Sequence, residues 1–217
     1  MSETSIENKA VEIYSHFALD FAYKTPRNLL AFIDNHDVAR WLYKHPSMEE
    51  IKQAIGLLLT IPRIPQIYYG TEILLAGDGN GVSDGNMRQD YPWDNPLTAE
   101  QQDFKTLISK LLKWRSTHKT IAEGEMIHFV PFDGKTYVYF RYLKDVNGNI
   151  DGNKVVMVVI NYSEERNRLK LSRFTEILSL CESWIDVIDN RKLLLNAMSS
   201  ITIKANGIMI LESNKDD

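Results

Sequence analysis

The stretch "NLLAFIDNHDVARW", residues 28–41, decides how the first half of this sequence is interpreted. Its apolar run, residues 29–34, has the length of a short buried strand and is too short for a helix. Three polar side chains follow directly: Asn35, His36 and Asp37. In parallel α/β architectures the active site lies beyond the carboxyl ends of the strands, so this position favours a functional site. A plain turn or helix cap, in which Asn and Asp are also common, is the alternative.

The flanking sequence predicts an alternation of helices and strands. Apolar spacing predicts a helix over 6–23, and capping-box patterns at Ser47 and Thr98 open two further helices. A second β-prone piece lies at 66–69, and a long glycine-rich loop over 75–95 follows it. The order helix, strand, helix, strand, helix predicts parallel strands with right-handed crossovers. Two strands are too few for a closed barrel or a stable open sheet.

The pattern changes near residue 120. The runs "KTYVYFRYL" (135–143) and "KVVMVVINYS" (154–163) are rich in β-branched and aromatic residues, and a Gly/Asn hairpin loop separates them. Shorter strands are expected at 168–172, 183–189, 199–205 and 207–213. The sequence therefore predicts two domains: an α/β domain over 1–120 and an antiparallel β-sandwich over 121–217.

Composition excludes several classes of function. The 217 residues carry a net charge of −4 without a basic stripe, which argues against nucleic acid and against polybasic attachment to a membrane. The longest apolar run, 55–61, is too short to span a bilayer, and the first residues do not form a signal peptide. The single cysteine, Cys181, has no metal-ligand spacing around it. A soluble protein without a cofactor is expected.

The polar residues beyond the two strands suit a hydroxyl-rich ligand. A carboxylate accepts hydroxyl hydrogen bonds, an imidazole donates or accepts one, and an anionic Asp stabilises an oxocarbenium-like transition state. Arg40 and Arg88 are expected to lock the carboxylates in place with paired donors. Flat faces for sugar rings are available from Tyr68, Tyr69, Tyr91 and Trp93. A divalent-metal site formed by Asp34, His36 and Asp37 is the other alternative.

Two longer motifs carry a resemblance to a known family. "FIDNHDVAR" (32–40) and "LLLTIPRIPQIYYGTEI" (57–73) resemble the ends of the seventh and eighth barrel strands of the α-amylase family of glycoside hydrolases. "GNMRQDYPW" (85–93) is similar to the loop that follows, and the likeness is strongest to the neopullulanase and cyclomaltodextrinase branch. The resemblance implies that 1–120 holds the last two βα units of a TIM (β/α)8 barrel and that 121–217 is the family's C-terminal domain.

The resemblance also implies roles for individual residues. Asp37 would be the carboxylate that distorts the sugar ring and stabilises the transition state, and His36 would bind the sugar at the cleavage subsite. The implied substrate-binding and supporting residues are Asn35, Arg40, Arg88 and Tyr91. No metal and no cofactor are implied, and the ligand would be an α-glucan oligosaccharide.

The sequence departs from the family at the two groups that break the bond. Retaining hydrolysis needs a carboxylate nucleophile and a separate acid, and no Gly-x-Arg-x-Asp motif occurs among these residues. We therefore expect the C-terminal fragment of a retaining hydrolase acting on α-1,4/α-1,6-glucans such as starch, pullulan, cyclodextrin or maltooligosaccharides. Alone it would be inactive.

The partner of the chain would be the missing N-terminal barrel portion, or a second copy in a dimer. The intact enzyme would belong to the bacterial cytoplasm or periplasm. A non-catalytic glucan-binding module and a metal-dependent hydrolase centred on His36 are the alternatives.

Overall fold

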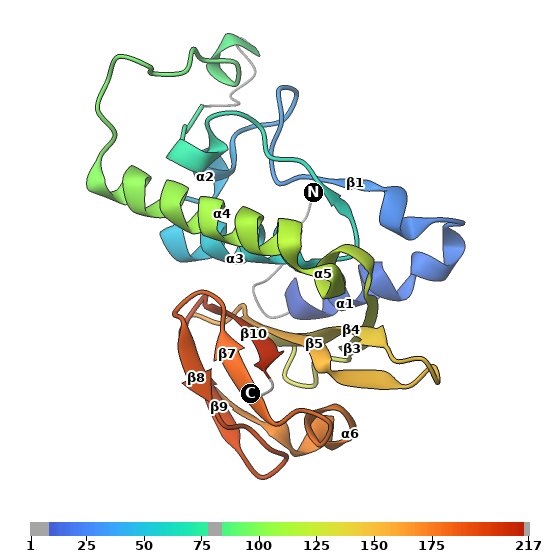
Figure 1. Ribbon diagram of the computed structural model, residues 1–217. Coiled ribbons are helices and arrows are strands. Elements are labelled where there is room, and N and C mark those ends of the chain that lie inside the picture. The colour runs from blue at the N-terminus through green and yellow to red at the C-terminus, as the bar shows by residue number, and fades with distance from the viewer. Residues whose placement is uncertain (1–8, 78–83, 215–217) are drawn as a thin grey trace.

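The computed structural model describes residues 9–77 and 84–214. Residues 6–8 of the first predicted helix and 78–83 of the predicted loop lie outside the described residues. A helical half comes first, and a β-rich half packs beneath it (Figure 1). The helices of the first half are α1 (Lys9–Ala18), α2 (Trp41–Lys44), α3 (Met48–Thr60), α4 (Ala99–Thr117) and α5 (Lys119–Glu123). Short 3-10 turns occupy Asp20–Ala22, Pro26–Asn28, Thr71–Ile73 and Asp84–Asn86.

Two short strands, β1 (Leu30–Ala31) and β2 (Ile64–Pro65), form a parallel pair. Leu30 lies opposite Ile64, so the prediction that the two strand segments are parallel neighbours is confirmed. The position of the second strand was predicted wrongly, because the pairing falls on 64–65 and residues 66–69 are not strand. The pairing ends with Gln66, whose N–H donates to the carbonyl of Ala31 at 2.8 Å.

Both predicted N-caps form, but among the described residues the reciprocal bond of a capping box is present only at Thr98. The Glu50 N–H donates to the Ser47 hydroxyl at 3.3 Å, and at Thr98 both bonds of the capping box with Gln101 are present, at 3.2 and 2.9 Å. The first predicted helix is shorter than expected: α1 ends at Ala18 and a 3-10 turn follows. The Glu50 side chain pairs with Lys9 at 3.2 Å, so the start of α3 also holds α1.

The second half is built on a six-stranded sheet, β3-β4-β5-β10-β7-β8, in which every neighbouring pair is antiparallel. Its strands are β3 (Glu125–Phe129), β4 (Thr136–Lys144), β5 (Ile150–Asn161), β7 (Ser183–Asp186), β8 (Arg191–Leu193) and β10 (Ile208–Asn214). A separate antiparallel pair is formed by β6 (Asn167–Lys170) and β9 (Ser200–Ile203), and a short helix α6 spans Thr175–Leu178. The predicted antiparallel β half is therefore confirmed. Strands β3 and β8 and helix α6 were not predicted.

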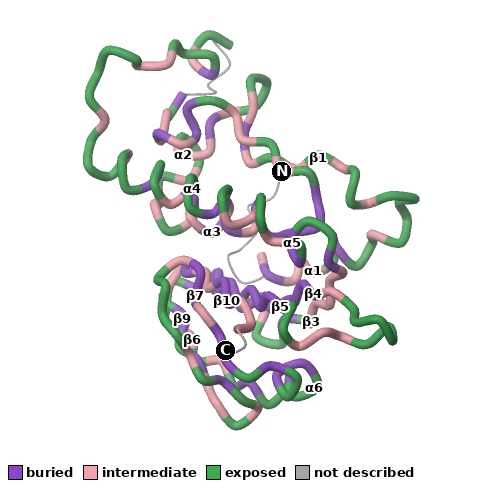
Figure 2. Tube along the Cα trace, viewed as in Figure 1, coloured by how far each residue is buried: buried purple, intermediate pink, exposed green. Residues whose placement is uncertain are grey.

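The six-stranded sheet is buried on both faces. Along β4 and β5 the side chains alternate, so Tyr139 and Val158 join the core beneath the helices while Phe140 and Val159 join the core shared with Ile201 of β9. In Figure 2 the buried residues run along β5 and β10 between these two layers. The sheet therefore holds both cores of the molecule in one body of packed layers.

Polar contacts also fix the two halves together. The fully buried Arg141 of β4 donates to the carbonyls of Thr60, Ile121 and Gly124 at 2.6–2.9 Å, which caps the ends of α3 and α5 from the sheet side. The Tyr139 hydroxyl lies 2.5 Å from that of Thr60. Burial raises the pKa of Tyr139 well above its usual range, so its hydroxyl stays neutral.

No helix in the described part of the chain is both long and apolar enough to cross a bilayer.

Candidate functional site

The segment that follows β1 turns sharply because of Asn35. Its side-chain oxygen accepts the backbone N–H groups of Asp37 and Val38, at 2.8 and 3.1 Å, which closes an Asx turn. The turn leaves the next two side chains pointing outward: His36 is 58% exposed and Asp37 is 64% exposed. The His36 Nε2 lies 3.2 Å from an Asp37 carboxylate oxygen. The Asx turn therefore places the imidazole of His36 next to the carboxylate of Asp37.

Asp34 anchors this turn to the segment that follows β2. It is buried, with one carboxylate oxygen accepting the Thr71 hydroxyl at 2.7 Å and the other accepting the Trp41 N–H at 3.2 Å. The possible role of Asp34 as a metal ligand beside His36 and Asp37 is not supported, because both oxygens are occupied by donors. Within residues 9–77 and 84–214, no group of three or more His, Cys, Asp or Glu side chains is arranged to hold a metal ion.

Arg88 joins the later loop to the candidate carboxylate. Its Nη2 lies 3.3 Å from Asp37 and 3.0 Å from Asp84, and its Nε donates to the His36 carbonyl at 3.2 Å. The expectation that an arginine restrains Asp37 thus applies to Arg88. All three side chains are largely solvent-exposed, so these pairs orient the carboxylate and add little to stability.

Arg40 packs against two tyrosine rings rather than against a carboxylate. Its side chain is buried, and its guanidinium carbon stands 4.1 Å from the ring centre of Tyr68 and 5.1 Å from that of Tyr69. Neither terminal nitrogen has a hydrogen-bond partner among the residues that the structure describes. The expectation that Arg40 locks a carboxylate is therefore wrong. Arg40 instead packs the turn after β1 against the aromatic pair after β2. Burial and the neighbouring Tyr69 raise the pKa of Tyr68, so its hydroxyl remains a neutral donor.

Tyr91 lies with Trp93 in the loop beyond Arg88. Their ring centres are 4.4 Å apart and Trp93 is 83% exposed. The loop is held near the site by the Tyr69 hydroxyl, which donates to the Gln89 carbonyl at 2.7 Å. Among the described residues, Tyr91 makes no hydrogen bond or ring contact with the His36–Asp37 pair. The structure thus brings together Asn35, His36, Asp37 and Arg88, and leaves Tyr91 at the margin.

The contacts of Thr71 and Asp84 were not anticipated from the sequence. Thr71 is the buried partner of Asp34, and Asp84 is the second carboxylate on Arg88. For Thr71 the sequence offers one signal, since it follows Gly70, a glycine that ends the β-prone piece predicted at 66–69 and that is left-handed in the structure. Asp84 offers none, because it is one of several acidic residues in a polar loop.

Comparison with known proteins shows what the chain as a whole is similar to. Residues 126–212 match the family described as the cyclo-malto-dextrinase C-terminal domain. A cyclomaltodextrin glucanotransferase of Geobacillus stearothermophilus is 31% identical over 156 residues, covering 72% of this chain and 20% of that protein. A maltogenic α-amylase of Bacillus acidopullulyticus is 30% identical over 183 residues, covering 83% of this chain and 28% of that protein.

Solved structures agree on the fold. An Anoxybacillus α-amylase superposes with a TM-score of 0.74 at 19% identity, covering 97% of this chain and 44% of that one. A maltogenic α-amylase of Thermotoga neapolitana gives 0.71 at 20% identity, covering 95% and 46%. The chain thus corresponds to the C-terminal part of α-amylase-family glycoside hydrolases. Within that family its β half matches the cyclomaltodextrinase type. The chain spans between a fifth and somewhat over a quarter of the two curated relatives.

Proposed function

We propose that this chain supplies the last part of the active site of a retaining glycoside hydrolase acting on α-1,4- or α-1,6-linked glucans. The observation that carries the proposal is the placement of Asp37: in the turn that follows the first of two parallel strands, 3.2 Å from His36 and restrained by Arg88. At that position an ionised carboxylate accepts two sugar hydroxyls and stabilises positive charge that develops on the ring. The imidazole of His36 adds a further hydrogen bond to the sugar.

In this proposal β1 and β2 are the last two strands of a (β/α)8 barrel, and the boundary with the C-terminal domain lies near residue 120. The nucleophile and the acid would come from further strands of a larger enzyme. The β1–β2 pair supports this, because Leu30 and Ile64 lie opposite each other and are 62% and 47% exposed. Apolar side chains on a strand pair normally pack against a further layer.

The first test is turnover by the chain alone. We expect no release of reducing sugar from maltoheptaose or β-cyclodextrin, because retaining hydrolysis needs two carboxyl groups flanking the bond and this sequence has no Gly-x-Arg-x-Asp motif. Turnover by the purified chain that disappears in Asp37→Ala would contradict the need for carboxylates from elsewhere.

The second test is a chimera. This chain replaces the aligned part of the Bacillus acidopullulyticus maltogenic α-amylase, and kcat is measured on maltoheptaose. Asp37→Asn should lower kcat by about 100-fold or more, because transition-state charge loses its partner. The matched control is Asp84→Asn, which also removes a carboxylate from Arg88 and should leave kcat within a few-fold. Equal effects of both variants would remove Asp37 from the catalytic machinery.

A non-catalytic glucan-binding role is the second candidate, and the exposed ring pair of Tyr91 and Trp93 favours it. Binding of maltoheptaose that is lost in Trp93→Ala, together with a chimera whose kcat is insensitive to Asp37→Asn, would establish this role in place of the first.

A further inference from the structure

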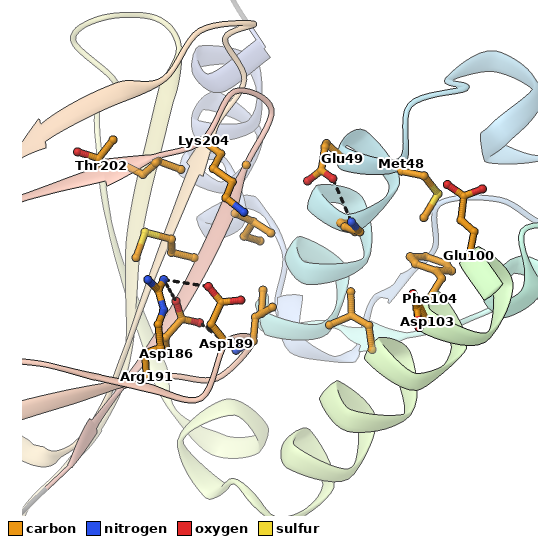
Figure 3. A pocket seen from close by; sticks show the side chains of 17 residues that line it. Met48, Glu49, Glu100, Asp103, Phe104, Asp186, Asp189, Arg191, Thr202 and Lys204 are labelled. Atoms are coloured by element: carbon orange, nitrogen blue, oxygen red, sulfur yellow. Dashed lines mark hydrogen bonds and ion pairs between the residues drawn. The ribbon is translucent and has the colours of Figure 1, made fainter.

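A cavity of about 690 Å³ lies between the two halves of the molecule, away from the His36–Asp37 pair. Figure 3 shows its two walls facing each other, one from helices α3 and α4 and one from the β half. The cavity volume is typical of sites that hold small ligands. The charged lining of the cavity includes Glu100 and Asp103 on the helical wall and Asp186, Asp189, Arg191 and Lys204 on the wall from the β half.

The wall from the β half is preorganised. The buried Asp186 accepts the backbone N–H groups of Ile188 and Asp189 at 3.0 and 3.1 Å. Arg191 bridges Asp186 and Asp189, at 3.4 and 2.9 Å. Lys110 of α4 donates to the Ile188 carbonyl at 2.9 Å, which ties this wall to the helices. The groups on this side are therefore held in place before any ligand arrives.

Three further charged side chains, on both walls of the cavity, have no partner among the described residues. Glu100 and Asp103 on α4 and Lys204 beyond β9 are exposed, and their side chains make no hydrogen bond or ion pair with any described residue. In Figure 3 Lys204 reaches from the β half toward α3. The first turn of a helix favours acidic residues in any protein, so Glu100 by itself indicates no ligand. The free lysine opposite two free carboxylates adds donors and acceptors across one gap.

The floor between the charged groups is apolar. Leu107, Ile208 and Met209 are half-buried and Phe104 is almost fully buried, so carbon surface lies at the base of the cavity. A ligand that fits must therefore offer both polar groups and an apolar face.

We propose that this cavity binds an uncharged, polyhydroxylated ligand, namely an α-glucan oligosaccharide, at a second site separate from Asp37. A ligand of either net charge would meet like charges, because carboxylates and cations both line the cavity. Hydroxyls donate to Glu100 and Asp103 and accept from Lys204 without that penalty. The C–H face of a glucose ring covers the apolar floor. The choice of an α-glucan rests on the proposed function, whereas the class of neutral polyol rests on the cavity.

The experiment is calorimetric titration of the full chain with maltoheptaose, and with spermine and inositol hexakisphosphate as charged probes. The double variant Glu100→Gln with Lys204→Gln should bind maltoheptaose about tenfold more weakly or worse, because two charged hydrogen bonds are lost. The matched control is Lys105→Gln with Glu176→Gln, an equal change of charge at exposed positions outside the cavity. Thermal unfolding of all variants checks that the fold is retained.

The outcomes separate this proposal from the catalytic one. Binding that survives Asp37→Asn and weakens in the cavity variant supports the second site. Absence of heat with maltoheptaose, equal weakening by the control variant, or tighter binding of a charged probe at the cavity each overturns it. Heat that is lost only in His36→Gln or Asp37→Asn also overturns it and leaves the proposed function standing.

Discussion

Two carboxylates three residues apart in sequence lie in opposite environments. Asp34 is 2% exposed and accepts two hydrogen bonds, whereas the Asp37 side chain is 64% exposed and restrained only by other exposed groups. The first carboxylate therefore contributes to stability, and the second is free to act on a ligand.

Asp34→Ala should lower the free energy of unfolding by about 2–3 kcal/mol, because the Thr71 hydroxyl and the Trp41 N–H lose a charged acceptor. Asp37→Ala is the internal control and should change it by less than about 0.5 kcal/mol. Urea denaturation followed by tryptophan fluorescence measures both. A loss of stability in Asp37→Ala as large as that in Asp34→Ala would disprove the assignment.

For single residues, the sequence predicts which side chains lie at the site better than it predicts which side chains they contact. Asn35, His36 and Asp37 could be singled out because they follow an apolar run of strand length. Arg88, rather than Arg40, restrains Asp37, and this could not be predicted, because the choice depends on how a loop 51 residues further along the chain returns. Burial of a guanidinium against two tyrosine rings leaves no periodic signal.

Helix α4 is fastened to the sheet through one acidic residue. Glu212 of β10 accepts the indole N–H of Trp114 at 2.6 Å and lies 3.1 Å from His118 Nε2. Burial raises the pKa of Glu212, but the hydrogen bonds from His118 and Trp114 outweigh burial and hold it below its ordinary value.

A carboxyl whose pKa is lower in the folded state stabilises the fold above its unfolded pKa of about 4.3, and loses that contribution as pH falls through the folded pKa. Wild type should therefore exceed Glu212→Gln in stability at pH 6, and the difference should shrink as the pH falls below the unfolded pKa of about 4.3 and through the lower folded pKa. Urea titrations across that range measure it. A difference that is constant with pH would exclude the ionised carboxylate as the source.

Long elements with strong patterns were predictable, and short ones were not. Helices α3 and α4 carry both an apolar face and a cap, and β4 and β5 are long β-branched runs. Strand β8 has three residues, two of them exposed and charged, so it forms only because β7 offers an edge. Strand β2 lies at 64–65 instead of the predicted 66–69, because pairing with the neighbouring strand β1 sets its position and local propensity does not.

The molecule as a whole exposes large apolar side chains unevenly. Around the β1–β2 pair, the exposed side chains include Leu19, Phe21, Leu30, Phe32 and Ile64. A face of this kind on an isolated chain favours association.

We expect concentration-dependent dimers or larger species in sedimentation velocity, and Leu30→Lys with Ile64→Lys should shift them toward monomer. The control is Val146→Lys, at an exposed apolar residue in the β4–β5 loop, which should not. A single monomeric species at all concentrations would contradict the expectation.

The position of Arg141 limits how this architecture can be divided. The matched segment 126–212 contains the guanidinium but not its acceptors on Thr60, Ile121 and Gly124. The excised β half would expose a tyrosine-lined face to solvent and leave Arg141 without these three carbonyl acceptors. An exchange of this module between relatives must therefore include helices α3 and α5, so the unit that can be exchanged is larger than the matched segment.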